Sequence, residues 1–307
     1  MRVVAIVVNW NGGADTLLCV ESLLAQVPPL ERVLVVDQAS SDGSRERVQR
    51  DFPIVEVIET GANLGYSGGN NRGAARAREL GADAFLVVNN DVTLEPHCVR
   101  ELVRALESNE RLAAVGPRVL LRDDPMRLWA AGGVLSWRQN LSDLRGFGQR
   151  DADEYRRTLE VDYVPGCAVL VRASALGGEE LFDDLYFAYT EDVDLGQRLR
   201  RAGFASACIG SVRAWHAPSS STGGGYNPRR KYMMAVNSVH FLRRWGGRRE
   251  WLRFLAFDVA TLPFALADGW CRGHANAVLA KALGIWHGLC GRRISAETVK
   301  SGATALW

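Results

Sequence analysis

Four short apolar runs, each followed at once by polar residues, limit the folds open to this chain more than any other feature. The runs occupy residues 3–8, 33–36, 55–58 and 85–88, and most of their side chains are β-branched. Such runs predict strands that are buried on both faces of a sheet. Helical spacing or capping residues follow at 17–24, 44–52, 70–80 and 99–106. Strands that alternate with helices predict an α/β fold, with a mostly parallel sheet covered by helices on both faces.

Polar residues stand at the predicted ends of three of these strands. Asn9 follows the first strand, Asp37 the second, and Asn89-Asn90-Asp91 the fourth. Ligands of such sheets bind beyond the carboxyl ends of the strands. We therefore expect these side chains to meet at one edge of the sheet and to form a site there.

The chain changes character twice after the fourth strand. Residues 118–163 show a weak pattern, which we interpret as a loop with short strands, and a second ordered block covers 163–170 and 181–204. A Ser/Gly-rich loop spans 218–225, and the chain then becomes helical, basic and rich in tryptophan. We expect two parts, residues 1–225 with the sheet and residues 226–307 as a helical C-terminal extension.

The bulk composition excludes few classes of protein. The chain has 307 residues and a formal net charge of +2, so nothing in its overall charge favours a nucleic-acid partner. None of the six cysteines has C-x-x-C spacing, so we expect free, buried thiols in a reducing compartment. The N-terminal apolar run is too short for a signal sequence, and a cytoplasmic location is expected.

Asn89 and Asp91 are candidates for holding a hard divalent cation, Mg²⁺ or Mn²⁺. Such an ion takes a few protein oxygens and fills its other positions with phosphate oxygens and water. Asp37 has the chemistry to accept hydrogen bonds from a ribose hydroxyl or a base. The alternative for all three is an ordinary turn residue, because Asn and Asp favour turns.

A glycine- and amide-rich run at residues 61–71 opens the third predicted helix. Small residues permit close approach of the backbone, and a helix N-terminus favours an anion such as a diphosphate. Many glycine-rich turns are only turns, so this signal alone is weak.

Three acids lie in the first turn of a predicted helix at Glu191-Asp192-Val193-Asp194. Spacing places Glu191 and Asp194 on one side of the helix and Asp192 elsewhere. The alternative role is to complement the helix dipole. Crowded acids beside aromatic residues can instead raise one pKa and create a general base. His216, further along the chain, is either structural or a metal ligand.

Together these residues resemble the family 2 glycosyltransferases with the GT-A fold. The matching motifs are Val7-Val8-Asn9-Trp10-Asn11-Gly12, Val35-Val36-Asp37-Gln38-Ala39-Ser40-Ser41-Asp42-Gly43-Ser44, Asn63-Leu64-Gly65-Tyr66-Ser67-Gly68-Gly69-Asn70-Asn71, Asn89-Asn90-Asp91, Gly166-Cys167, Phe187-Ala188-Tyr189-Thr190-Glu191-Asp192-Val193-Asp194-Leu195 and His216. Their order and spacing cover about three-quarters of the chain, and six motifs in order are specific where any one is weak.

The resemblance implies a role for each matched residue in an inverting, metal-dependent sugar transfer. Asp192 would be the catalytic base, and Asp37 would bind the nucleoside. The metal would be held by Asp91, Asn89 and His216. The remaining contacts to the nucleotide sugar would come from Asn9, Asn11, Asn63, Gly65, Gly69, Asn70, Asn90, Gly166 and Glu191.

Two positions depart from the family pattern. Gln38 stands where many relatives have Asn, and the D-x-D element reads Asn89-Asn90-Asp91, which leaves one carboxylate for the metal. The glycine-rich and acidic motifs look like the rhamnosyltransferase-like branch, which implies dTDP-L-rhamnose as donor and bacterial surface polysaccharide as product.

The basic, aromatic tail suggests where the acceptor lies. The apolar stretch at 254–266 is too short and too polar to span a bilayer. Arg243, Arg244, Arg248, Arg249 and Arg253, with Trp245, Trp251 and Trp270 among them, are typical of a segment on an anionic membrane surface. We expect a peripheral protein on the inner face of the membrane, acting on a glycan or polyprenyl-linked acceptor. The alternative is packing on the catalytic core or in a homodimer.

Two other functions fit the same sheet. A sugar nucleotidyltransferase also binds nucleotide and Mg²⁺, but its first turn usually carries a basic residue, which residues 9–13 lack. A non-catalytic binder of nucleotide sugars or glycans would not need Asp91, Asp192 and His216 together.

Overall fold

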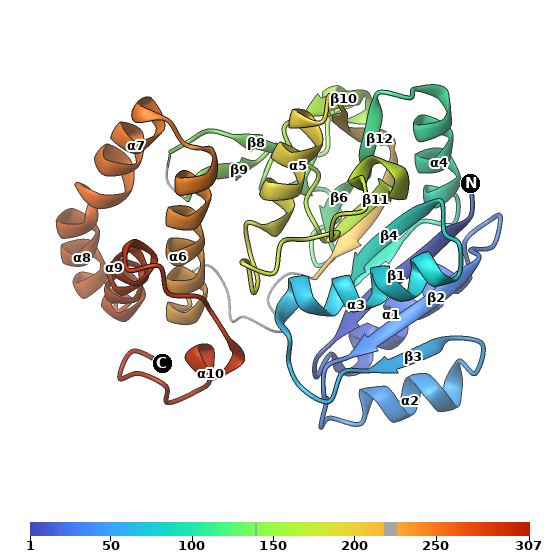
Figure 1. Cartoon of the computed structure of the whole chain (residues 1–307), viewed down its shortest axis with the longest axis horizontal. Coiled ribbons are helices and arrows are strands. Elements are labelled where there is room, and N and C mark those ends of the chain that lie inside the picture. The colour runs from blue at the N-terminus through green and yellow to red at the C-terminus, as the bar shows by residue number, and fades with distance from the viewer. Residues whose placement is uncertain (139, 218–225) are drawn as a thin grey trace.

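A mixed sheet flanked by helices forms the larger part of the molecule, and further helices stand beside it (Figure 1). The structure is a computed structural model and describes residues 1–138, 140–217 and 226–307. The strands are β1 (Val3–Asn9), β2 (Arg32–Asp37), β3 (Glu56–Glu59), β4 (Ala84–Asn89), β5 (Val92–Leu94), β6 (Leu112–Leu121), β7 (Leu128–Ala130), β8 (Gly133–Leu135), β9 (Ser142–Leu144), β10 (Thr158–Val161), β11 (Ala168–Arg172) and β12 (Ala205–His216).

Helices join these strands and form the C-terminal part of the chain. The α-helices are α1 (Gly13–Leu24), α2 (Ser44–Asp51), α3 (Gly65–Glu79), α4 (Cys98–Ser108), α5 (Glu191–Arg201), α6 (Pro228–Trp245), α7 (Arg248–Phe254), α8 (Leu262–Cys271), α9 (Ala275–Leu289) and α10 (Ala296–Val299). Two 3₁₀ turns, Asp153–Arg156 and Ala173–Leu176, and a π-helical turn at Leu255–Val259 complete them.

The predicted α/β fold is confirmed, but the sheet is less parallel than expected. The strand order β10-β12-β6-β11-β4-β1-β2-β3 contains a parallel block of β4, β1, β2 and β3. Next to it, β11 runs antiparallel to both β4 and β6. The expectation of a mostly parallel sheet was wrong because β11 enters the sheet from a long excursion of short strands, without the helical crossover that parallel neighbours require.

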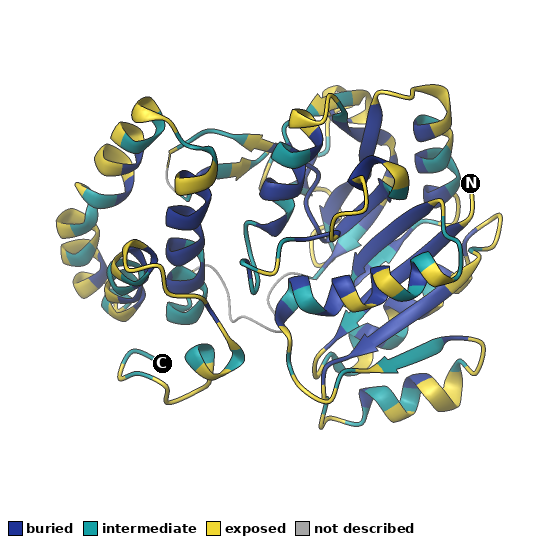
Figure 2. Cartoon of the chain, in the orientation of Figure 1, coloured by how far each residue is buried: buried dark blue, intermediate teal, exposed yellow. Residues whose placement is uncertain are grey.

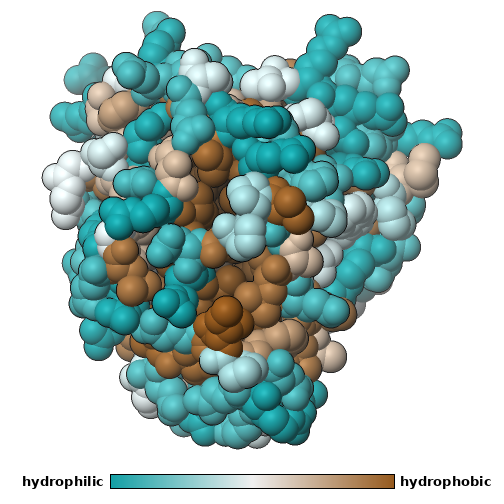
Figure 3. All heavy atoms as spheres, turned by 90° about the vertical axis from the view of Figure 1, so that its right-hand side faces the viewer, coloured by the Kyte–Doolittle hydropathy of each residue, from teal (hydrophilic) through white to brown (hydrophobic). Residues whose placement is uncertain are grey.

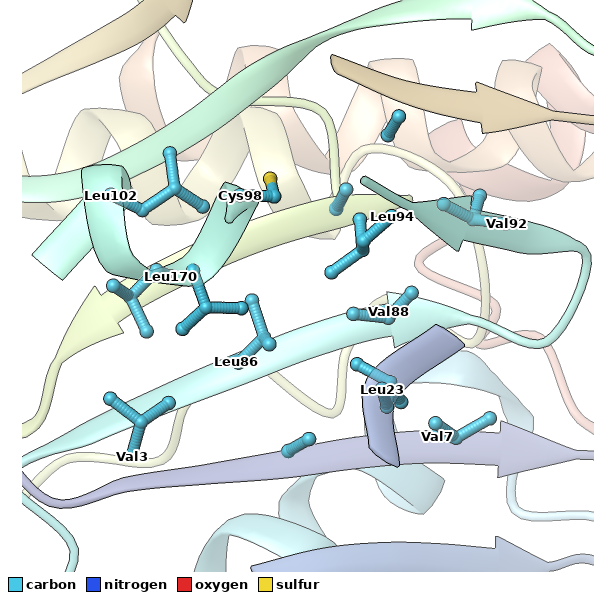
Figure 4. Packing of buried hydrophobic residues seen from close by; sticks show 14 of the residues in the cluster. Val3, Val7, Leu23, Leu86, Val88, Val92, Leu94, Cys98, Leu102 and Leu170 are labelled. Atoms are coloured by element: carbon cyan, nitrogen blue, oxygen red, sulfur yellow. The ribbon is translucent and has the colours of Figure 1, made fainter. Parts of the chain in front are cut away.

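Both faces of β1, β2 and β4 are buried, as the continuous apolar runs predict, whereas β3 at the edge is only half-buried. Alternate residues of β1 point to opposite sides: Val3, Ala5 and Val7 face a core that includes side chains of α1 and α4, shown in Figure 4. Val4 and Ile6 face a second core, with side chains from α3 and α5. The two-sided burial explains why these strands lack polar residues until they end.

The glycines of α3 permit the closest helix–sheet contact in this part of the fold. A Cβ on Gly73 would lie 2.3 Å from Cγ2 of Ile6, and one on Gly69 would lie 3.0 Å from both methyl groups of Val8. Only glycine lets the helix backbone rest on β1 at this distance. The helix begins at Gly65, five residues before the predicted start at Asn70, because the run that we interpreted as a turn is its first turn and a half.

The expected loop with short strands at 118–163 is confirmed by β7, β8, β9 and β10, but the long strand β6, most of which lies before this region, was not predicted. β6 covers ten residues and pairs with both β11 and β12. Its middle reads Gly116-Pro117-Arg118, which interrupts the apolar run that marks the other strands. Arg118 is buried there beside Asp151, at 3.2 Å between Nε and Oδ1.

The C-terminal helices share a core with the sheet part. Val239, Phe241 and Leu242 of α6 pack with Tyr163 and Tyr186, so α6 is buried while α7 and α8 are largely exposed (Figure 2). The expected packing of the tail on the catalytic part is therefore confirmed. The division at residue 225 stays a prediction, and the loop 218–225 lies outside the described residues.

One helix of the tail is longer than the sequence indicates. The segments α7, the π-helical turn and α8 join into a helix of 24 residues, Arg248–Cys271, which is long and apolar enough to cross a membrane by length and composition alone. It is the one such helix in the described part of the chain. The expectation that residues 254–266 are too short to span a bilayer was wrong, because the helix extends beyond this stretch at both ends.

The cysteines differ in part from expectation. All six are free thiols, as predicted. Cys271 and Cys290 are exposed, however, because both lie at the ends of tail helices that the sheet does not cover.

The contact at Gly73 generates a test of the fold. Gly73→Val places new methyl groups against Ile6 and should lower the free energy of unfolding by about 1–3 kcal/mol, the usual cost of overpacking. Ala75→Val, on the exposed side of the same helix, is the matched control and should change little. Denaturant unfolding of both variants measures this, and equal stabilities would contradict the packing described.

Candidate active site

The register of the sheet brings the polar strand ends together. Asn9 of β1 is paired with Asp37 of β2, and Val8 is paired with Asn89 of β4. The predicted gathering of Asn9, Asp37 and Asn89 at one edge of the sheet is thereby confirmed. The physical cause is that parallel strands end on the same side.

Asn9 and Asp37 form a buried hydrogen-bond network. Nδ2 of Asn9 donates to Oδ2 of Asp37 at 2.8 Å and to the hydroxyl of Ser44 at 2.9 Å. The backbone N–H of Ser40 donates to the other oxygen of Asp37 at 3.0 Å. Neither Asn9 nor Asp37 has exposed surface, so in this structure both hold the loop after β2. A contact between Asp37 and a nucleoside therefore requires that this loop opens.

The loop after β1 lies against Asn90. A Cβ on Gly12 would lie 1.9 Å from Nδ2 of Asn90, which donates to the hydroxyl of Thr16 at 3.2 Å. Asn11 adopts a left-handed backbone and accepts a hydrogen bond from the N–H of Ser41 at 2.7 Å. The three loops at this edge are thus tied to one another through Asn side chains.

Asp91 and His216 lie together just beyond β4. Nε2 of His216 is 3.1 Å from Oδ1 of Asp91, and both side chains are buried. They meet because β5 and β12 are neighbours in the sheet, with Val92 opposite His216. Trp129 packs edge-on against the imidazole, with ring centroids 4.5 Å apart.

The atoms around Asp91 fit a divalent cation in chemistry. Oδ1 of Asn89, Oδ1 of Asp91 and Nδ1 of His216 are buried and have no hydrogen-bond partner among the described residues. Buried polar atoms without partners are rare and call for an explanation such as an ion. The described residues contain no group of three His, Cys, Asp or Glu arranged for a metal, so an ion here also needs oxygens from its substrate or water.

A short backbone path joins this corner to Asp192. The N–H of Asn89 donates to the carbonyl of Cys167 at 2.9 Å. The N–H of Gly166, one residue earlier, donates to Oδ2 of Asp192 at 2.9 Å. Burial, followed by the charges of Asp91 and Asp192, raises the pKa of the Cys167 thiol, which shows that both carboxylates act on the same point. The structure thus brings Asp91, Gly166 and Asp192 into one site.

Asp192 and Glu191 form a coupled pair of carboxyl groups. Burial, and then the charge of Asp192, raises the pKa of Glu191 well above its ordinary value. Burial also raises the pKa of Asp192, but the N–H groups of Gly166 and Val193 oppose that shift. Because donated hydrogen bonds stabilise the charged form, these N–H groups favour a charged Asp192 over a charged Glu191.

Asp194 belongs to the framework and not to the site. Its Oδ1 accepts from the indole N–H of Trp245 at 2.8 Å, and its Oδ2 accepts from Nε of Arg198 at 3.0 Å. It is fully buried against α6. The acids do lie in the first turn of a helix, as expected, and Asp194 contacts α6 while the charge of Asp192 acts on Glu191.

Most of the glycine-rich run packs against protein. A Cβ on Gly65 would lie 2.3 Å from the carbonyl of Phe187, and Gly69 lies against Val8. Asn63 caps the start of α3 by accepting from the N–H of Gly65 at 2.8 Å. Asn70 is buried, and its Oδ1 has no hydrogen-bond partner among the described residues. The structure thus gives the two glycines a packing role.

Two residues that sequence reasoning missed position the backbone around Asp192. The hydroxyl of Tyr66 donates to the carbonyl of Gly166 at 2.7 Å. The side chain of Asn237, in α6, donates to the carbonyls of Ala188 and Tyr189 at 2.9 and 2.7 Å. Tyr189 and Thr190 both adopt left-handed backbones before α5, which is costly for residues with a Cβ. Asn237 was detectable as a polar residue, next to Ser238, within the apolar stretch of the predicted helical tail.

The arrangement suits a displacement reaction at one end of a diphosphate. One side offers the buried Asp91–His216 pair and Oδ1 of Asn89, and the other offers the carboxyl group of Asp192. Tyr66 of α3 donates to the carbonyl of Gly166, and the N–H of Gly166 donates to Asp192. Trp10, the first residue after β1, is 43% exposed.

Comparison with known proteins identifies the group to which the chain belongs. It is 34% identical over 247 residues to the N-acetylglucosaminyl-diphospho-decaprenol L-rhamnosyltransferase of Mycobacterium tuberculosis, covering 73% of this chain and 78% of that protein. Its fold is similar to that of the mannosyltransferase PcManGT from Pyrobaculum calidifontis in complex with GDP-Man and Mn²⁺, with a TM-score of 0.60 and 14% identity over 95% of this chain and 88% of that one. It also resembles GalNAc-T7 with UDP, GalNAc and Mn²⁺, with a TM-score of 0.59 and 12% identity over 78% of this chain and 51% of that one. The profile of glycosyl transferase family 2 matches residues 4–176. These agreements confirm the expected resemblance: the chain is a glycosyltransferase and belongs to glycosyl transferase family 2.

Proposed function

We propose that this glycosyltransferase moves L-rhamnose from dTDP-L-rhamnose to a lipid-linked glycan, with inversion at the anomeric carbon and with a divalent metal. The single observation that supports the reaction type is that one site holds both Asp192, which accepts a hydrogen bond from the N–H of Gly166, and the buried Asp91–His216 pair. The donor sugar and acceptor rest on the 34% identical relative and its printed activity. Family membership leaves the nucleotidyltransferase and the non-catalytic binder without support.

Asp91, Asn89 and His216 would hold Mg²⁺ or Mn²⁺. When bound, the ion would neutralise the charge that grows on the departing diphosphate. The unpartnered atoms Oδ1 of Asn89 and Nδ1 of His216 support this set. Asn11, Asp37, Asn63 and Asn90, on the loops around the sheet edge, would contact the nucleotide.

Asp192 would accept the proton of the acceptor hydroxyl. The hydroxyl oxygen forms a bond to the anomeric carbon while the bond from that carbon to the diphosphate oxygen breaks, and the proton goes to the carboxylate. Burial raises the pKa of Asp192 and so makes it a stronger base. Gly166 and Tyr66 would orient it, and the proton on Glu191 spares the pair a second negative charge.

The acceptor would lie at a membrane surface. Phe264 and Trp270, on the long tail helix, are 78% and 79% exposed. Asp258, in the middle of that helix, is buried and pairs with Lys281, 2.7 Å away. A helix that crossed a bilayer would carry this ion pair into hydrocarbon, so an orientation in the plane of the interface is favoured.

Not all of the expected membrane residues remain available for that contact. Arg243 donates to the carbonyls of Gly288 and Leu289, and Arg244 pairs with Asp183. The indole of Trp245 is bonded to Asp194. The proposed surface therefore consists of exposed residues of the long helix: Arg248, Arg249, Leu252, Arg253, Leu255, Phe264 and Trp270.

The face of the sheet part away from the tail is mostly hydrophilic, with an apolar strip at its centre (Figure 3).

A metal role for Asp91 predicts how nucleotide binding depends on Mn²⁺. Asp91→Asn should nearly abolish turnover and remove the gain in dTDP affinity that Mn²⁺ gives the wild type, because the only carboxylate of the set is lost. Titration calorimetry with Mn²⁺ and with chelator measures both. If the variant binds dTDP as tightly as the wild type under both conditions, Asp91 does not hold the metal.

A base role for Asp192 predicts unequal effects of two neighbouring isosteres. Asp192→Asn should lower kcat by at least about 10²-fold, the lower range for loss of a general base, with donor binding intact. Glu191→Gln mimics the protonated state and should cost much less. Steady-state kinetics compare the two, and a larger loss in Glu191→Gln would transfer the role to Glu191.

The apolar tail surface predicts binding to anionic liposomes. Replacing Leu252, Phe264 and Trp270 together by Ser should leave the protein in the supernatant after co-sedimentation, because insertion of large apolar side chains is lost. Ile54→Ser is the matched control, since Ile54 is 66% exposed on the sheet part. A wild type that stays in the supernatant at low salt, or a triple variant that sediments like it, would refute the surface.

A further inference from the structure

The first turn of α6 is unusually basic. It carries Arg229, Arg230 and Lys231 and no acidic residue, although Asn227 caps it by accepting from the N–H groups of Arg229 and Arg230. Positive side chains are unfavourable at a helix N-terminus, where the backbone already presents positive partial charge. A local rule broken in this way indicates a function instead of a contribution to folding.

A second helix brings another cation to the same place. α9 runs parallel to α6, since Gly284 lies against the backbone of Tyr232 and Gly288 lies against Val236 and Val239. Lys281, one turn before Gly284, therefore lies near the start of α6. Its ammonium group pairs with Asp258 at 2.7 Å.

Lys231 sits among like charges. Burial first, and then the charges of Lys281 and Arg230, lower its pKa, and Asp258 opposes this only in part. Among the described residues, the side chains of Arg230 and Lys231 have no carboxylate partner, and each lies over an aromatic ring. An anion bound here would relieve the repulsion between the three cations.

The cluster lies between the catalytic base and the exposed apolar helix. The guanidinium of Arg230 is 5.6 Å from the ring centroid of Tyr189, two residues before Glu191. On its other side, Asp258 belongs to the π-helical turn of the long tail helix, ahead of Phe264 and Trp270. In Figure 1 the start of α6 lies between α5 and α8.

We propose that Arg230, Lys231 and Lys281, the cationic cluster, bind the diphosphate of a prenyl-diphosphate-linked acceptor. This inference rests on the proposed function. Such an acceptor needs its prenyl chain at an apolar surface, its diphosphate beside cations and its sugar near the base. The exposed tail helix, the cationic cluster and Asp192 follow one another in that order along the molecule. The donor's diphosphate belongs instead to the edge of the sheet at Asp91.

The test compares two acceptors, one with and one without a diphosphate between the sugar and its hydrocarbon chain. One is N-acetylglucosaminyl diphosphate carried on a short prenyl chain, and the other is an alkyl glycoside of the same sugar. The variants are Lys231→Met and Arg230→Gln, because Lys281 is needed to pair with buried Asp258. Arg104→Gln, on exposed α4, removes the same charge far from the cluster and is the control.

Both variants should raise KM for the diphosphate acceptor by about tenfold or more, the scale of one charge-assisted hydrogen bond. KM for the alkyl glycoside and for the donor should change by less than about twofold. Lys231→Met should melt no lower than the wild type, since it removes a repelled charge. A change below about twofold with the diphosphate acceptor, or equal changes with both acceptors, would overturn the proposal.

Binding measurements separate this proposal from the proposed function. If the wild type transfers sugar to neither acceptor, the proposed function fails, and titration with farnesyl diphosphate and with inorganic pyrophosphate still tests the cluster. Tight binding of farnesyl diphosphate that weakens in Lys231→Met supports the site. No binding, or binding of pyrophosphate alone with equal strength in the variant, overturns it.

Discussion

The pairing of β11 with β4 is the interaction on which the active site depends. It places the carbonyl of Cys167 against the N–H of Asn89, and the adjoining Gly166 then donates to Asp192. One backbone–backbone hydrogen bond and one from a backbone N–H to a carboxylate thus set the spacing between the corner at Asp91 and the carboxylate at Asp192. A sheet ladder is stiffer than a loop, and a displacement reaction needs its groups held within a fraction of an ångström.

Helix α6 provides the second support of the same carboxylate. Asn237 holds the carbonyls before α5, and Trp245 holds Asp194 in its first turn. These bonds keep two consecutive left-handed residues in place, a conformation that persists only where its surroundings impose it. The tail that carries the exposed apolar helix therefore also positions Asp192, because α6 contacts the first turn of α5 and the residues before it.

Much of the sheet part was predictable because its signals are local. The apolar runs of β1, β2 and β4 predict strands buried on both faces, and the polar residues at their ends predict the candidate site. Prediction failed where contacts are distant. The apolar run of β6 is interrupted by Pro117 and Arg118. Their position in the strand depends on Asp151 and on the neighbouring strands. Glycines 65 and 69, which suggested a diphosphate loop, are required by Phe187 and Val8.

The sequence by itself determined the family and the parallel core, and it indicated Asp91, Asp192 and His216 as candidate site residues, since these follow from residue order and spacing. Only the tertiary structure decided which acid of the crowded turn accepts hydrogen bonds from backbone N–H groups that favour its charged form. That depends on the N–H groups of Gly166 and Val193 beside Asp192, and on α6 taking Asp194. It also decided which arginines of the tail remain free, because ion pairs and burial arise from residues far apart in the chain, which no local pattern records.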